Sequence, residues 1–150
     1  MLSVGIEEYK KLSGKFIIGD KNGKGREFLI DKNYQIFEGE YLNGKRNGKG
    51  KDYINYDAKL VFEGEYLKGK RNGKGKEYYD NGKLKFEGEY KDGKIWTGNG
   101  YNINGKKEFE IKDGAGKIKE FYVDGKLKFE GEYLNGERNG KGKEYIDYDA

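Results

Sequence analysis

The sequence predicts an all-β protein: an elongated, single-layer, twisted antiparallel sheet of stacked β-hairpins, with about a dozen short strands. Three observations predict it: one motif recurs along the chain, apolar and charged residues alternate within it, and a hairpin-turn dipeptide lies at its centre. Helices are disfavoured, because 26 glycines are spread through the chain and each glycine inside a helix costs about 1 kcal/mol relative to alanine.

The recurring motif is FEGEYLNGKRNGKG at residues 37–50. It returns with few changes at Phe62 and Phe129, partially at Phe86, and in divergent form at Leu12. Residues 1–11 do not match and are expected to cap the first strand, so the repeat array spans residues 12–150. Its six units are residues 12–36, 37–61, 62–85, 86–108, 109–128 and 129–150.

Each copy has the pattern of a hairpin. Residues 83–90 alternate strictly, which places aromatic residues and glycine on one face and charged residues on the other. Asn43-Gly44 favours a two-residue turn, because both turn residues must adopt a positive φ. An uninterrupted two-residue hairpin then pairs Tyr41 with Arg46, and the predicted pairs further along are Glu38 with Lys49, Phe37 with Gly50, Glu130 with Lys141 and Phe129 with Gly142. Charge pairs would cover one face, and rings would lie across glycines on the other.

This pattern resembles the MORN repeat, and the resemblance covers roughly residues 12–150. It implies the ribbon of stacked hairpins and a non-catalytic scaffold that mediates protein–protein interaction or docking. It also implies an alternative function, which is peripheral binding to anionic phospholipid membrane surfaces through a basic row of hairpin turns.

Composition argues against an enzyme. The chain has no cysteine and no histidine, which excludes a thiolate nucleophile and removes the commonest general base and the commonest transition-metal ligand. Carboxylates recur in every unit, as expected of cross-strand partners, whereas a catalytic pair occupies one constellation. The glycine–lysine runs lack the spacing of a phosphate-binding loop, and no calcium loop is present. We therefore expect no catalytic residues, no cofactor and no metal.

Nucleic acid is not an expected partner. The net charge is only +4, and glutamates lie beside the aromatic residues, where they would repel phosphate. We expect an unidentified protein partner, with anionic lipid headgroups as the alternative. The last strand would present an open edge, which favours a homodimer through the C-terminal edge, although charges on that edge oppose it.

The fourth unit is irregular around Trp96, the only tryptophan. Its return arm to the G-x-G pair counts one residue more than in the other units, which predicts a β-bulge. One interpretation is a ring-lined groove that recognises a partner. The other is local packing of Trp96 to fill the bulge.

Two sets of candidate binding residues follow. Tyrosines offer contact area and a hydroxyl group, so the candidate partner-binding residues are Tyr41, Tyr66, Tyr90, Trp96 and Tyr133; ring-on-glycine packing is the competing role. Stacked hairpins would align the basic turn residues, so the candidate anionic-lipid-binding residues are Lys45, Arg46, Lys70, Arg71 and Arg138; a solvated charge ladder is the competing role.

The expected location is the cytoplasm, with peripheral membrane contact as the alternative. The first residues, Met1 to Glu8, lack the basic and apolar regions of a signal peptide, and no apolar run approaches membrane-spanning length.

Overall fold

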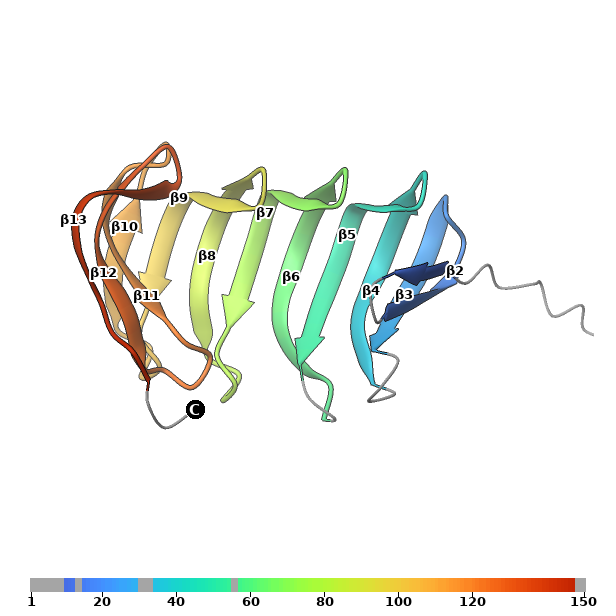
Figure 1. Ribbon diagram of the computed structural model, residues 1–150, viewed down its shortest axis with the longest axis horizontal. Coiled ribbons are helices and arrows are strands. Elements are labelled where there is room, and N and C mark those ends of the chain that lie inside the picture. The colour runs from blue at the N-terminus through green and yellow to red at the C-terminus, as the bar shows by residue number, and fades with distance from the viewer. Residues whose placement is uncertain (1–9, 13–14, 30–33, 55–56, 148–150) are drawn as a thin grey trace, which may run out of the picture. The chain divides into compact units, whose positions relative to one another are not determined.

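The computed structural model describes residues 10–12, 15–29, 34–54 and 57–147 (Figure 1). In these residues thirteen β-strands pair antiparallel, which confirms the all-β fold of antiparallel hairpins. No helix in this part of the chain is long and apolar enough to cross a membrane. The chain divides into two compact units, Met1–Lys70 (unit 1) and Arg71–Ala150 (unit 2).

Unit 1 is a single antiparallel sheet in which strands adjacent in sequence are neighbours in space. Residues 1–9 of the expected cap lie outside the described residues, whereas Lys10 and Lys11 belong to the first strand. The strands of unit 1 are β1 (Lys10–Leu12), β2 (Lys15–Gly19), β3 (Gly23–Leu29), β4 (Gln35–Leu42), β5 (Lys45–Ile54) and β6 (Lys59–Leu67).

Unit 2 contains two sheets. In the first, β7 (Lys70–Tyr78), β8 (Leu84–Lys91), β9 (Lys94–Tyr101) and β10 (Lys107–Ile111) are consecutive neighbours, and the second is formed by β11 (Gly116–Phe121), β12 (Leu127–Leu134) and β13 (Glu137–Glu144). The two sheets of unit 2 contact each other: the fully buried ring of Tyr79 lies 6.3 Å from that of Phe121, and the Asp80 N–H donates to the Val123 carbonyl at 3.0 Å.

The second sheet begins in the contracted fifth unit. This unit lacks the Gly-Glu-Tyr signature, and its side chains Ile111 and Ile118, both almost fully buried, take the place of rings packed on glycine. A single bridge joins Lys112 to Ala115 at the turn, after which β10 and β11 belong to different sheets.

Rings pack on glycines, as the sequence predicts. Phe37 is fully buried, and a Cβ atom on Gly50 would lie 2.5 Å from the Phe37 ring and 3.1 Å from that of Tyr66. The rings also meet edge to face, with centroids of Phe37 and Tyr66 separated by 5.3 Å. Such pairs contribute about 0.5–1.5 kcal/mol beyond their burial. The glycines are therefore needed as space for aromatic side chains.

The predicted register is correct only beside the turn. Tyr41 faces Arg46, but Gly39 then faces Gly50 and Glu38 faces Lys51, so the predicted pairing of Glu38 with Lys49 is wrong by two residues. The hairpin of β12 and β13 has the same shift: Gly131 faces Gly142, Glu130 faces Lys143 and Phe129 faces Glu144.

A bulge with three residues opposite one causes this shift. Gly48 has a φ of 96°, in the left-handed region that glycine tolerates best. Opposite the bulge, the Glu40 carboxylate accepts a hydrogen bond from the Lys49 N–H at 2.6 Å. The glutamate of the Gly-Glu-Tyr signature thus satisfies a backbone group that the bulge removes from the ladder.

Candidate interaction surfaces

The predicted tyrosine surface is mostly buried. Tyr41, Tyr66 and Tyr90 expose only 5%, 5% and 4% of their surface, and Tyr133 is half-buried. The prediction that these rings form an exposed docking surface is therefore wrong for the first three. Its competing interpretation, packing of rings on glycines, describes them, because a Cβ on Gly25 would lie 2.8 Å from the Tyr41 ring.

The hydroxyls of Tyr66, Tyr90 and Tyr133 are directed at carboxylates of the preceding strands, whereas the buried hydroxyl of Tyr41 makes no hydrogen bond within the described residues. The hydroxyls of Tyr90 and Tyr133 donate to Glu77 and Glu120, each at 2.6 Å, and that of Tyr66 donates to Asp52. Burial and the neighbouring carboxylate Glu120 raise the pKa of Tyr133 well above its usual value. These tyrosines are therefore neutral hydrogen-bond donors within the sheet.

The arginines complete this inner network. Arg46 Nε lies 2.5 Å from Glu27, its Nη1 lies 2.9 Å from Asp52, and its guanidinium carbon lies 3.9 Å from the Phe37 ring centroid. Arg46 thus joins two neighbouring hairpins. Because Glu27 is only 7% exposed, Arg46 offsets the cost of burying its carboxylate.

The same arrangement occurs in unit 2. Arg138 Nε lies 2.7 Å from Glu120, its guanidinium lies 4.1 Å from the Phe129 ring centroid, and it also pairs with Glu144. Arg71 Nη1 lies 3.3 Å from Glu77. The three arginines of the predicted basic row are thus ion-paired on the aromatic face, and Arg138 is exposed there as well. The remaining two members, Lys45 and Lys70, are exposed.

Trp96 fills the fourth hairpin locally. Tyr90 faces Ile95 and Glu89 faces Thr97, so Trp96 is the bulged residue. Its half-buried ring lies against two turns, since a Cβ on Gly114 would come within 2.6 Å of it, and Lys91 Nζ lies 4.5 Å from its centroid. A bulge is confirmed here, and the contacts favour local packing over an open groove.

The count of an additional residue in this hairpin is wrong, however. Gly88 faces Gly98, as Gly39 faces Gly50, so Gly98 corresponds to Gly50 rather than to Gly48. The return arm of the fourth hairpin is one residue shorter than that of the second.

A turn-to-turn hydrogen-bond ladder escaped the sequence prediction. In unit 1 the N–H groups of the turn glycines Gly44 and Gly69 donate to the carbonyls of Lys21 and Arg46, at 2.9 and 2.8 Å. Unit 2 repeats the bond from Gly93 to Arg71, from Gly114 to Trp96 and from Gly136 to Gly114.

Side chains reinforce this ladder. Asn72 Oδ1 accepts from the Asp92 N–H at 3.2 Å, and Thr97 Oγ1 accepts from the Asp113 N–H at 3.0 Å. Asn47 has the same role for Lys68 at 3.4 Å. The asparagine that follows the arginine in the motif, as Asn47 and Asn72 do, was the sequence signal from which these contacts could have been predicted.

On the opposite face, the same pairing of basic with acidic residues occurs in three places. Gly25, Gly50 and Gly75 each face the glycine of the next Glu-Gly-Glu segment, and the basic residues on either side of them face its glutamates. The basic and acidic pairs are Lys24–Glu40, Arg26–Glu38, Lys49–Glu65, Lys51–Glu63, Lys74–Glu89 and Lys76–Glu87. Exposed pairs of this kind add little stability, but like charges in these positions would disfavour a wrong register.

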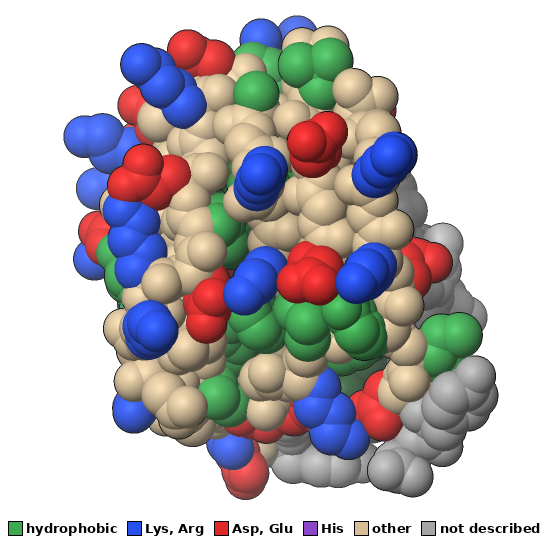
Figure 2. All heavy atoms as spheres, turned by 90° about the vertical axis from the view of Figure 1, so that its left-hand side faces the viewer, with side chains coloured by type: hydrophobic (Ala, Val, Ile, Leu, Met, Phe, Trp, Pro, Cys, Tyr) green, Lys and Arg blue, Asp and Glu red, His purple; other side chains and the backbone are tan. Residues whose placement is uncertain are grey.

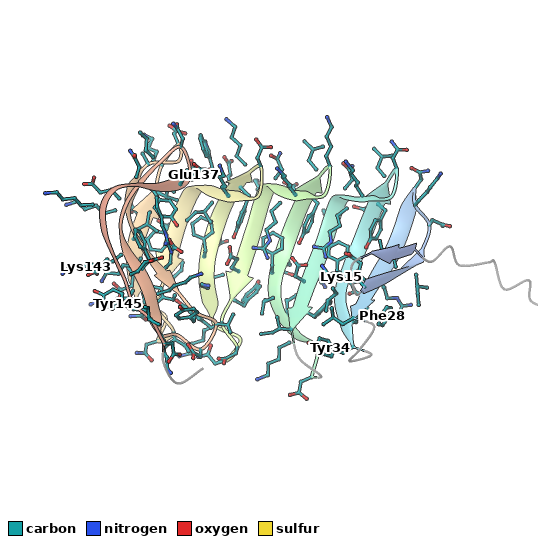
Figure 3. All side chains as sticks on the ribbon, viewed as in Figure 1. Lys15, Phe28, Tyr34, Glu137, Lys143 and Tyr145 are labelled. Atoms are coloured by element: carbon teal, nitrogen blue, oxygen red, sulfur yellow. The ribbon has the colours of Figure 1, made fainter. Side chains whose placement is uncertain are left out.

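Strand β13 forms an edge of the three-stranded sheet. All eight of its residues are exposed, and no strand of the described residues pairs with its outer side. Glu137, Lys143 and Tyr145 lie along this edge (Figure 3). On this end of unit 2, basic and acidic side chains interleave around hydrophobic ones (Figure 2). Its segment Lys141-Gly142-Lys143 repeats the sequence of Lys49-Gly50-Lys51.

No group of side chains suited to a metal ion occurs in the described part of the chain. The comparison with protein families finds the MORN repeat, with matches at residues 37–51, 62–83, 86–96 and 129–149. No curated protein matches the chain.

Proposed function

Because the chain is a MORN-repeat protein, we propose that it is a non-catalytic scaffold that binds other proteins, with strand β13 as the docking edge. MORN repeats are generally associated with protein or membrane interactions, which is the family-level support for this proposal. An edge strand with unpaired backbone groups can take up an extended strand of another chain.

The chemistry of the partner strand follows from the repeated pairing of basic with acidic residues. Three times in this protein a strand with basic residues flanking a glycine pairs with a Glu-Gly-Glu segment. In β13, Lys141-Gly142-Lys143 offers the same basic, glycine, basic order without a strand on its outer side among the described residues. The preferred occupant is therefore an extended Glu-Gly-Glu strand of a partner protein. This observation carries the proposal.

Self-pairing of β13 fits less well. In an antiparallel pair centred on the strand, Arg138 would face Lys143 and Glu137 would face Glu144 of the second copy. Like charges directly opposite each other are destabilising. The homodimer expected from the open edge therefore becomes an alternative outcome of the test.

The test uses a labelled hairpin peptide with the sequence of residues 35–54, titrated with the full chain and followed by fluorescence anisotropy. We expect saturable binding that is lost when Lys141 and Lys143 are both replaced by Glu, and restored by a peptide whose two glutamates are replaced by Lys. Replacement of the exposed Lys83 by Glu is the control. Binding unaffected by the β13 substitutions would contradict the proposal, as would a concentration-dependent dimer whose β13 edge excludes the peptide.

A membrane surface is the second candidate, and one observation in unit 1 favours it. Leu42 and Leu67 are 51% and 48% exposed, at equivalent positions beside turns that carry Lys45 and Lys70. Apolar and basic side chains side by side suit an anionic interface. The cytoplasm remains the expected location under both proposals, with contact at the membrane periphery under this one.

Vesicle sedimentation tests the second candidate. We expect weak binding to anionic vesicles that salt abolishes, because screening acts beyond about 8 Å at physiological ionic strength. Replacing Leu42 and Leu67 by Ser should weaken it, as should replacing Lys45 and Lys70 by Gln. Arg46 is not a suitable probe, because its replacement leaves Glu27 unpaired.

A further inference from the structure

A second kind of bulge places one additional side chain in each unit. It occurs where a hairpin's return strand meets the first strand of the next hairpin, and its residue precedes the buried phenylalanine. In unit 1 the bulged residues are apolar: Ile36 precedes Phe37 and Val61 precedes Phe62. In unit 2 they are charged: Lys85, Glu108 and Lys128 occupy the equivalent positions.

Glu108 has partners, and the two lysines lack them. Lys119 Nζ and Asn102 Nδ2 each donate to Glu108 at 3.0 Å. By contrast, the Lys85 and Lys128 ammonium groups neither donate a hydrogen bond nor form an ion pair with any described residue. Their only close partners are neutral rings, at 5.8 Å from Lys85 to Tyr79 and 5.5 Å from Lys128 to Tyr122.

The nearest carboxylates are already engaged. Glu77 accepts from the Tyr90 hydroxyl at 2.6 Å and pairs with Arg71. Glu120 accepts from the Tyr133 hydroxyl and from two nitrogens of Arg138. They attract the two lysines at longer range without direct contact, so the N–H donors of both ammonium groups remain unused by the described residues.

Lys85 and Lys128 come from different sheets, which meet at the rings beside them. The Tyr79 ring next to Lys85 lies 6.3 Å from that of Phe121, which directly precedes Tyr122, the ring next to Lys128. Burial lowers the pKa of the Lys85 ammonium, Glu77 opposes this effect, and repulsion by Lys128 and Arg71 adds to it. Lys85 is half-buried and Lys128 is exposed, so a ligand can reach the two lysines from solvent on the side of Lys128. A ligand between them would need negative charge and several acceptor oxygens.

We propose that Lys85 and Lys128 form a binding site for a small phosphate-bearing anion between the two sheets of unit 2. Lysine suits phosphate as a compact point charge with three donors, and the flanking rings leave those donors free. A monovalent carboxylate would gain less, because it carries less negative charge and fewer acceptor oxygens. The site is independent of the β13 docking edge and has no counterpart in unit 1, where the bulged residues are Ile36 and Val61.

The test titrates pyrophosphate into the full chain carrying isotope-labelled lysine and follows the lysine side-chain signals by NMR. We expect saturable shifts of the Lys85 and Lys128 signals. Replacing either lysine by Met should weaken the affinity about fivefold, the equivalent of about 1 kcal/mol for one nearby cation. Lys83→Met is the matched control, because Lys83 is exposed and lies two residues from Lys85 in the same strand region.

A thermal melt of each variant verifies folding, and Lys85→Gln replaces Lys85→Met if that variant does not fold. Vesicles containing phosphatidic acid form a second arm, in which binding that depends on Lys85 identifies a lipid phosphate as the ligand source. An absence of shifts with both probes overturns the proposal. Equal weakening by Lys83→Met also overturns it, because it would indicate general attraction to the net positive charge.

Discussion

The hairpins β4–β5 and β8–β9 begin with the same Phe-Glu-Gly-Glu-Tyr segment and differ in the strand that returns. Tyr41 faces Arg46, which links Glu27 and Asp52, whereas Tyr90 faces Ile95. The first strand thus supplies the rings in both hairpins. The return strand decides whether the inner face is a polar network or an apolar one.

The bulges differ in the same way. In β5 the three residues Asn47 to Lys49 lie opposite Glu40, and Gly48 takes a positive φ. In β9 only Trp96 is added, and its ring packs against the following turns. A first strand of the same length thus pairs with two different return strands, because each return strand brings its own contacts for the bulged residues.

The residue opposite the tyrosine is expected to affect the stability of the two hairpins most strongly. Replacing Arg46 by Met should destabilise the protein by about 3 kcal/mol, because it leaves the buried carboxylate of Glu27 without its partner. Replacing Ile95 by Met should cost less than about 1.5 kcal/mol, since an apolar residue of similar size keeps its packing. Urea denaturation followed by circular dichroism measures both.

A double substitution distinguishes lost charge pairing from lost packing. Adding Glu27→Gln to Arg46→Met removes the unpaired charge, so part of the lost stability should return. If the double variant is less stable than Arg46→Met alone, the ion pair is not the reason for the arginine.

The next largest loss of stability is expected when a glycine that packs against an aromatic ring is replaced. Alanine at Gly50 should cost about 2 kcal/mol, because its Cβ would lie 2.5 Å from the Phe37 ring. Alanine at Gly100 in β9 should be at least as costly, since its Cβ would overlap the Phe109 ring. Gly44→Ala is the control: nothing lies within 4 Å, and only its φ of 76° costs about 1 kcal/mol. If thermal melts show Gly44→Ala to be the most destabilising of the three variants, this explanation is contradicted.

The glutamate of the Gly-Glu-Tyr signature is expected to stabilise one of the two hairpins more than the other. Glu40→Ala should cost about 1 kcal/mol, because the Lys49 N–H loses its acceptor in the bulge. Glu89→Ala, at the same position of β8, should change stability by less than about 0.5 kcal/mol, since Glu89 accepts no backbone hydrogen bond among the described residues. Equal losses in chemical denaturation would mean that the carboxylate does not stabilise the bulge.

These residues also show how far the sequence predicts the structure. Alternation and the Asn43-Gly44 turn were sufficient for the fold and for the pairing of Tyr41 with Arg46, because both depend on local spacing. The register beyond the turn was missed, since Gly48 has the same signature whether it lies in a regular strand or in a bulge. Only the contact with Glu40 distinguishes the two.

The candidate sites were harder to predict for a related reason. Tyr41 and Arg46 look like surface residues in a polar sequence, yet packing on Gly25 and pairing with Glu27 turn them inward. The positions of Lys85 and Lys128 depend on bulges and on a second sheet, which no local pattern specifies.

The smallest effect is expected at alkaline pH and concerns Tyr53 on the outer face of β5. Burial, followed by the hydrogen bond that its hydroxyl donates to Glu38 at 2.8 Å, raises its pKa from 10.0 to about 12. Neutral Tyr53 therefore contributes stability in full below pH 10.0, and this contribution disappears as the pH rises to about 12, because the unfolded chain ionises first. Tyr53→Phe should flatten that part of the decline in a pH series of urea melts. Tyr101→Phe, at the corresponding place in β9 and without a hydroxyl hydrogen bond among the described residues, is the matched control. If the two variants lose stability in parallel between these pH values, the bond to Glu38 does not distinguish the hairpins.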